Sequence, residues 1–172
     1  MDACELLRKQ IATAHEWLEG TMADVTAEQA DWTPPGVATP LGASYAHAVF
    51  SEDMIVNGML RGAAPLYAGE WAGKTGQSEL HPDQDWTNYK AWTRGVRLDL
   101  DAARAYAQAV YAATSEYLAH LSPEDLDREI NAFGAPASVG LVLANYVAGH
   151  CHDLMGEISC LKGLQGVRGY PF

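Results

Sequence analysis

The densest cluster of chemically active side chains is residues 150–153, His-Cys-His-Asp, inside an otherwise apolar stretch near the C-terminus. The apolar residues on both sides fit a buried helix, and on a helix His150 and His152 point about 200° apart. These two imidazoles therefore cannot bind the same metal ion. We expect His150 to face the protein interior and His152 to face outward or sideways. Three residues are expected on the same broad side of the helix as His150: Asp153, Leu154 and Glu157.

Cys151 stands between two histidines, an arrangement that would activate the thiol if an imidazole accepted its proton. However, neighbouring residues on a helix point about 100° apart, so the sequence favours a small buried or partly buried cysteine over a nucleophile. Cys160 is interpreted in the same way. The third cysteine is Cys4, and since Cys151 and Cys160 lie on one predicted helix, no disulfide framework is expected and a reducing compartment is predicted.

The other chemically active side chains are predicted to have structural roles. Isolated histidines are more often packed or exposed residues than ligands, and three are assigned to this group: His15, His81 and His120. Two acidic pairs are assigned to a solvated helix face and to the N-terminal end of a helix, respectively: Glu52-Asp53 and Asp99/Asp101. The Glu-x-x-His signature of di-iron bundles, the P-loop and the Gly-x-Ser-x-Gly motif do not occur in the sequence.

Apolar residues spaced three or four apart predict four long helices: residues 3–22, 42–60, 100–121 and 138–163. Capping signals predict two short helices: residues 26–29 and 122–129. Residues 62–97 are rich in Gly, Pro and Trp, with room for one short helix from Asp83 to Trp92. Convincing strands are absent. The predicted fold is an all-α four-helix bundle forming a single domain over residues 1–172. Its long irregular connection between the second and third long helices could cover a site.

The charge of the chain limits its partners. The 172 residues include 11 basic and 22 acidic side chains, which gives a net charge of −11. This charge repels phosphate backbones and anionic lipid surfaces, so neither nucleic acid nor a membrane is expected as a partner. No signal peptide is recognised, and no apolar stretch is long enough to span a bilayer. The sequence thus predicts a cytoplasmic protein.

Two segments of the sequence resemble the motif regions of the DinB-like superfamily. The first, residues 44–53 (Ser-Tyr-Ala-His-Ala-Val-Phe-Ser-Glu-Asp), is similar to the family helix that carries a histidine ligand followed by acids. The second, residues 150–158 (His-Cys-His-Asp-Leu-Met-Gly-Glu-Ile), is similar to the family pattern His-x-x-x-His-x-Gly-(Gln/Glu)-Ile. The family includes metal-dependent hydrolases, bacillithiol S-transferases and mycothiol-dependent maleylpyruvate isomerase. Its name carries no implication of DNA binding.

The resemblance implies that His47 and His150 are metal ligands, with a divalent ion, zinc or nickel, as the cofactor. In the family pattern a second histidine stands four residues after the first, whereas this chain has Leu154 there, which cannot ligate. Three explanations stay open. A carboxylate, Asp153 or else Glu157, replaces the histidine. Alternatively, two histidines hold the ion weakly, or the metal is lost and a binding or structural cavity remains.

If the site is active, the resemblance implies thiol-dependent transfer, isomerisation or hydrolysis, with a small-molecule substrate or a thiol cosubstrate as the partner. The rival hypothesis is a metal-free, dimeric bundle that binds a small apolar ligand or a protein. It predicts that apolar side chains fill the space near Leu154. A homodimer is plausible for either hypothesis. Three tryptophans in or near the irregular stretch could line the mouth of a pocket: Trp71, Trp86 and Trp92.

Overall fold

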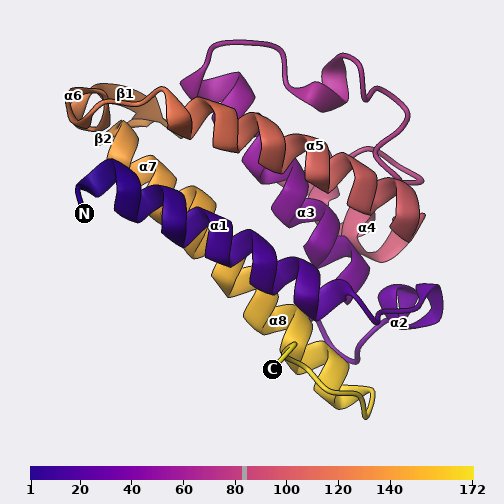
Figure 1. Ribbon diagram of the computed structural model, residues 1–172. Helices are drawn as coiled ribbons and strands as arrows, with labels where there is room; N and C mark the ends of the chain where they lie inside the picture. Colours follow the sequence, from indigo (N-terminus) through magenta and orange to yellow (C-terminus); the bar gives the residue numbers. More distant parts are fainter. Residues whose placement is uncertain (83–84) are drawn as a thin grey trace.

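Four long helical segments dominate the computed structural model, which describes residues 1–82 and 85–172 (Figure 1). They are α1 (Ala3–Met22), α3 (Leu41–Asp53) with its continuation η1 (Met54–Leu60), α5 (Leu100–Ala119), and the continuous run of α7 (Val139–Val142), η3 (Leu143–Gly149) and α8 (His150–Leu164). The shorter helices are α2 (Ala27–Asp31), η2 (Leu66–Ala68), α4 (Trp86–Gly95) and α6 (Pro123–Asp127). The predicted all-α fold is confirmed. The predicted start of a short helix at Asp83 lies outside the described residues.

Local capping signals explain where several helices begin. The Asp2 side chain accepts a hydrogen bond from the backbone N–H of Glu5 at the start of α1. Thr26 and Gln29 form the predicted capping box of α2. Asp99 accepts from two backbone N–H groups in the first turn of α5, in agreement with its predicted place at a helix N-terminus. Each such cap stabilises a helix by about 1 kcal/mol.

The direction of the helices explains the long irregular connection. Figure 1 shows α1 and the α7–α8 run pointing one way, and α3 and α5 pointing the other way. In this bundle α8 contacts α1 and α3, and α5 contacts the same two helices. Because α3 and α5 are parallel, the chain between them must return along the length of the bundle. A crossover of this kind needs many residues, whereas antiparallel neighbours need only a short loop.

Two of the long helices contain π-helical turns. The segment η1 follows directly after α3, and η3 separates α7 from α8. Such turns are rare in proteins, and those that occur often lie at functional sites. The sequence predicted both helices as uninterrupted. Each π-helical segment contributes side chains to the cavity described below: Met54, Ile55 and Met59 from η1, and Tyr146 from η3.

A small hairpin corrects the prediction that the chain has no strands. Strands β1 (Glu129–Ala132) and β2 (Ala135–Ser138) pair antiparallel and are joined by Phe133 and Gly134. These two residues have φ angles of 54° and 90°. A two-residue hairpin turn with positive φ at both positions suits glycine, but it strains Phe133 because a side chain crowds the backbone there.

Burial corrects two further predictions and confirms one. Glu52 and Asp53 are buried, so they do not form a solvated helix face. Cys160 is exposed, whereas Cys151 is buried as predicted, and all three cysteines are free. Within residues 1–82 and 85–172, no helix is both long and apolar enough to cross a membrane.

Candidate functional site

His47 on α3 and His150 at the start of α8 meet in the wall of a cavity. Their Nε2 atoms are 3.2 Å apart, although the two residues are 103 positions apart in the sequence. The ring planes are perpendicular, with centroids 5.0 Å apart. The fold therefore brings together the two histidines that the resemblance implies as ligands.

A third imidazole lies against the other side of His47. The Nε2 atom of His81 is 2.9 Å from Nδ1 of His47, and the two ring planes are nearly parallel, 18° apart, with centroids 5.0 Å apart. His81 belongs to the irregular connection between α3 and α5, and its side chain is buried and lines the cavity. The sequence assigned His81 a structural role, because its place beside His47 depends on the path of the crossover and no spacing pattern marks it.

Burial favours the neutral form of all three imidazoles, because it lowers the pKa of each. It lowers the pKa of His47 to about 3, assisted by repulsion from charge on His150 and His81. Burial also lowers the pKa of His81 to about 4. The pKa of His150 is lowered by burial as well, and the negative charge of Asp153 partly offsets this effect. A neutral imidazole carries the lone pair that a metal ion or a proton donor needs.

The three imidazoles form a chain and do not surround one point. His47 directs Nε2 to His150 and Nδ1 to His81, so its two nitrogens face different partners. Two nitrogens bound to one tetrahedral zinc ion are about 3.3 Å apart, close to the 3.2 Å between His47 Nε2 and His150 Nε2. Among the residues described, no three or more His, Cys, Asp or Glu side chains are placed to hold an ion together. The pair His47 and His150 could share one ion, and the same 3.2 Å contact is also that of a hydrogen bond between the two rings.

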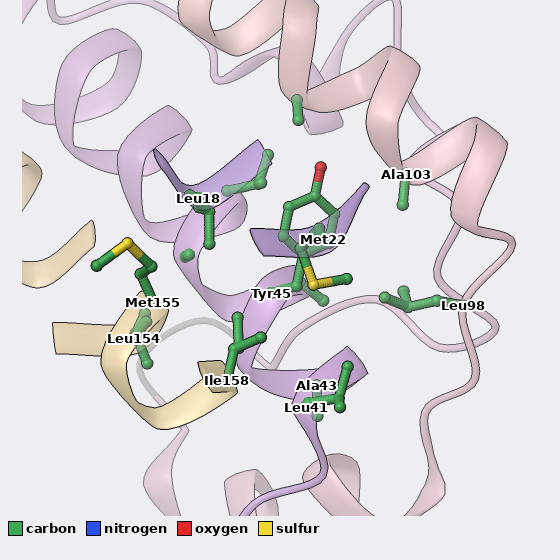
Figure 2. Close-up of a cluster of buried hydrophobic side chains, with 14 of the residues drawn as sticks. Leu18, Met22, Leu41, Ala43, Tyr45, Leu98, Ala103, Leu154, Met155 and Ile158 are labelled. Atoms are coloured by element: carbon green, nitrogen blue, oxygen red, sulfur yellow. The ribbon is translucent and has the colours of Figure 1, made fainter. Parts of the chain in front are cut away.

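The residues of α8 that follow His150 differ in burial. Leu154 is buried in the cluster of hydrophobic side chains that Figure 2 shows, together with Met155 and Ile158 of the same helix. Asp153 and Glu157 are exposed and do not line the cavity. His150 thus lies at the edge of the buried face of α8, and the two carboxylates lie just beyond that edge, because helix positions three and seven residues further on are rotated toward solvent.

The cavity beside the histidines has a volume of about 690 Å³, within the range of small-molecule sites. Its lining is mostly apolar and comes from α3, both π-helical segments and the hairpin. The imidazoles are therefore polar groups in the wall of an otherwise apolar space. The lining residues beyond the three histidines are Phe50, Ser51, Met54, Ile55, Met59, Asn131, Phe133, Gly134 and Tyr146.

Two aromatic rings form the rim of the cavity. Phe133 is 50% exposed and Tyr146 is 45% exposed, and their ring centroids are 5.1 Å apart. Trp71 and Trp92, two of the three tryptophans predicted at the mouth, do not take this place. Trp71 packs against Tyr106, and Trp92 is buried with its ring N–H donating to a backbone carbonyl. The side chain of Trp86 lies outside the described part of the chain.

The buried acids next to the site hold its surroundings in place. Glu52 accepts a hydrogen bond from the Thr114 hydroxyl and pairs with Nε2 of His15 at 2.8 Å. Asp53 accepts four hydrogen bonds, two of them from the backbone at the start of the crossover, where Tyr67 stacks on Phe50 of the cavity wall. The four donors to Asp53 are Asn57 Nδ2, Leu66 N, Tyr67 N and the Tyr106 hydroxyl.

Comparisons with known proteins agree with this architecture. The family model of the DinB superfamily matches residues 10–158, and the chain therefore belongs to this superfamily. Among solved structures, a conserved protein from Enterococcus faecalis is similar, with a TM-score of 0.75 and 21% sequence identity. The similarity covers 96% of this chain and 99% of that chain, and it shows a common fold. No curated protein matches the sequence.

Proposed function

We propose that this DinB superfamily protein binds a divalent ion, zinc or nickel, between His47 and His150 and acts on a small molecule held in the adjacent cavity. The observation that carries the proposal is the 3.2 Å approach of two Nε2 atoms in the cavity wall. Two ligands from the protein leave positions for a substrate or a thiol cosubstrate. When bound, such an ion lowers the pKa of a coordinated thiol or water and so supplies a nucleophile at neutral pH.

The side chains around the histidines define what the cavity accepts. Phe50, Met54 and Met59 offer apolar and easily adapted surface to the body of a small molecule. Phe133 and Tyr146 at the rim limit the access of water. A substrate with an apolar body and one thiol or carboxylate group would place that group at the imidazoles. Thiol-dependent transfer, isomerisation and hydrolysis all meet this description.

Metal analysis of protein purified without a histidine tag tests the proposal. We expect about one zinc or nickel ion per chain in the wild type, and a loss of that ion in His47→Ala and in His150→Ala. His120→Ala is the matched control, since the His120 ring pairs with a backbone carbonyl of its own helix. A low metal content that is the same in all four proteins would overturn the proposal.

Asp153 is the carboxylate whose charge acts on His150, and it is the first candidate for a third ligand. If it reaches the ion, Asp153→Asn weakens zinc binding sharply and leaves the fold intact. Glu157→Gln is the corresponding test for the carboxylate one turn further along. Unchanged zinc affinity in either variant removes that residue from the ligand set.

A metal-free binding module is the second candidate function. It is favoured by Leu154, which packs among apolar side chains where the family pattern has a histidine. In this case the cavity binds an apolar ligand in the presence of a chelator as well as in its absence. Calorimetric titration of the chelated protein with a hydrophobic probe, followed by addition of zinc, separates the two candidates.

A further inference from the structure

His81, in the crossover, is packed against side chains from several parts of the protein. Its ring stacks on Phe50 with centroids 4.3 Å apart, and it lies at 63° to the ring of Trp92 with centroids 4.5 Å apart. Its backbone N–H donates to the side-chain oxygen of Gln77, which fixes the main chain at this point. These contacts hold Nε2 of His81 at 2.9 Å from Nδ1 of His47. A loop residue held on several sides in this way has a defined orientation.

The hydrogen-bonding rules of imidazole restrict the protons in the chain of three rings. Neutral His47 carries one N–H, so one of its nitrogens donates and the other accepts. If Nε2 of His47 carries the proton, the lone pair of the ring is on Nδ1, where it is directed at His81 and away from His150. If Nδ1 carries the proton, it donates to His81, and the lone pair on Nε2 is directed toward His150 and the cavity. Only the second tautomer presents a ligand atom at the site.

We propose that His81 is a positioning residue, which accepts the Nδ1 proton of His47 and thereby fixes the tautomer and orientation that direct His47 Nε2 toward His150. This inference rests on the proposed function, because the lone pair that it fixes on His47 Nε2 is the one that would bind the metal ion. It assigns a role to His81, the third imidazole of the site, which lies in the crossover and not on α8. Histidine ligands commonly donate their second N–H to an acceptor, and loss of that acceptor weakens metal binding about 10- to 100-fold.

Nitrogen-15 NMR of the histidine side chains tests the proposal in metal-free protein, because the chemical shifts distinguish the two tautomers. The His47 signals are assigned from their loss in His47→Gln. In the wild type we expect the proton of His47 on Nδ1. A proton on Nε2 would overturn the proposal without need of any further variant.

Two substitutions at His81 separate positioning from packing. His81→Gln keeps an acceptor beside His47, and we expect it to keep the Nδ1–H tautomer and zinc affinity within a few-fold of the wild type. His81→Leu fills a similar space without the imidazole acceptor and leaves His47 Nδ1 only its longer, 3.4 Å contact with the Ser51 hydroxyl. We therefore expect mixed tautomers and a loss of zinc affinity of about 10- to 100-fold. An unchanged His47 tautomer in His81→Leu would overturn the proposal. Absence of zinc binding in the wild type would instead overturn the proposed function, and the tautomer measurement would still decide the role of His81.

Discussion

Asp53 links the helix that carries His47 to the crossover that carries His81, and its removal should loosen the site. Its carboxylate is fully buried and accepts four hydrogen bonds, including those from the backbone N–H groups of Leu66 and Tyr67. Hydrogen bonds to a charged acceptor each contribute about 1.5–3 kcal/mol, and some donors of the variant will regain water. We therefore expect Asp53→Ala to lower the free energy of unfolding by about 3–5 kcal/mol.

Urea denaturation and thermal melting measure this loss. For a chain of this length, 1 kcal/mol corresponds to about 2–4 °C in Tm, so a decrease of roughly 6–20 °C is expected. Asp53→Asn keeps the shape and one acceptor oxygen, and it should lose about half as much stability. Asp127→Ala, at an exposed position of α6, is the control and should change stability by less than about 0.5 kcal/mol. A loss below 1 kcal/mol in Asp53→Ala, or equal losses in both Asp53 variants, would refute this reasoning.

Three further predictions concern the core, the rim and pH. Leu154→Ala should lower the free energy of unfolding by about 2–5 kcal/mol in urea denaturation with zinc stoichiometry unchanged, and a lost ion would contradict a purely apolar role for this residue. Phe133→Asn should change stability by less than about 1 kcal/mol, because relief of backbone strain offsets loss of the Tyr146 contact. The same variant should weaken binding of anilinonaphthalene sulfonate in a fluorescence titration, and equal affinity would show that the rim does not contact ligands. Burial lowers the pKa of His47 to about 3 in the folded protein, whereas the unfolded chain binds a proton at this residue as the pH falls below about 6.5. Protonation therefore favours the unfolded chain, and the free energy of unfolding decreases as the pH falls through this range. In the metal-free protein, His47→Gln should remove about 1.4 kcal/mol per pH unit of this decrease between about pH 6 and 4.5, whereas an unchanged slope would contradict a neutral buried His47.

The long helices could be predicted from sequence because their cores repeat at helical spacing. The predicted range 3–22 coincides with α1, and the predicted second and fourth helices correspond to α3–η1 and α7–η3–α8. The π-helical turns were not predictable, since they depend on a change of backbone hydrogen bonding within an apolar run. The hairpin was missed because its strands are short and its turn contains Phe133, a residue that disfavours positive φ.

The site was only partly predictable. The residue pattern singled out His150, the family resemblance added His47, and the fold brings the two together. The role of Glu52 and Asp53 was misjudged because their partners come from distant parts of the chain, such as Thr114 and Tyr106. His81 was passed over for the same reason, since a loop histidine gains its significance from tertiary contacts that sequence spacing does not encode.

The proposed function requires that His47 and His150 hold one ion between their Nε2 atoms. Anomalous diffraction from crystals grown with zinc, recorded on both sides of the zinc absorption edge, locates such an ion. We expect one strong anomalous peak about 2.0–2.1 Å from each of the two Nε2 atoms, and no peak at this position in crystals of His150→Ala. A wild-type map without a peak between these atoms would contradict the proposed site.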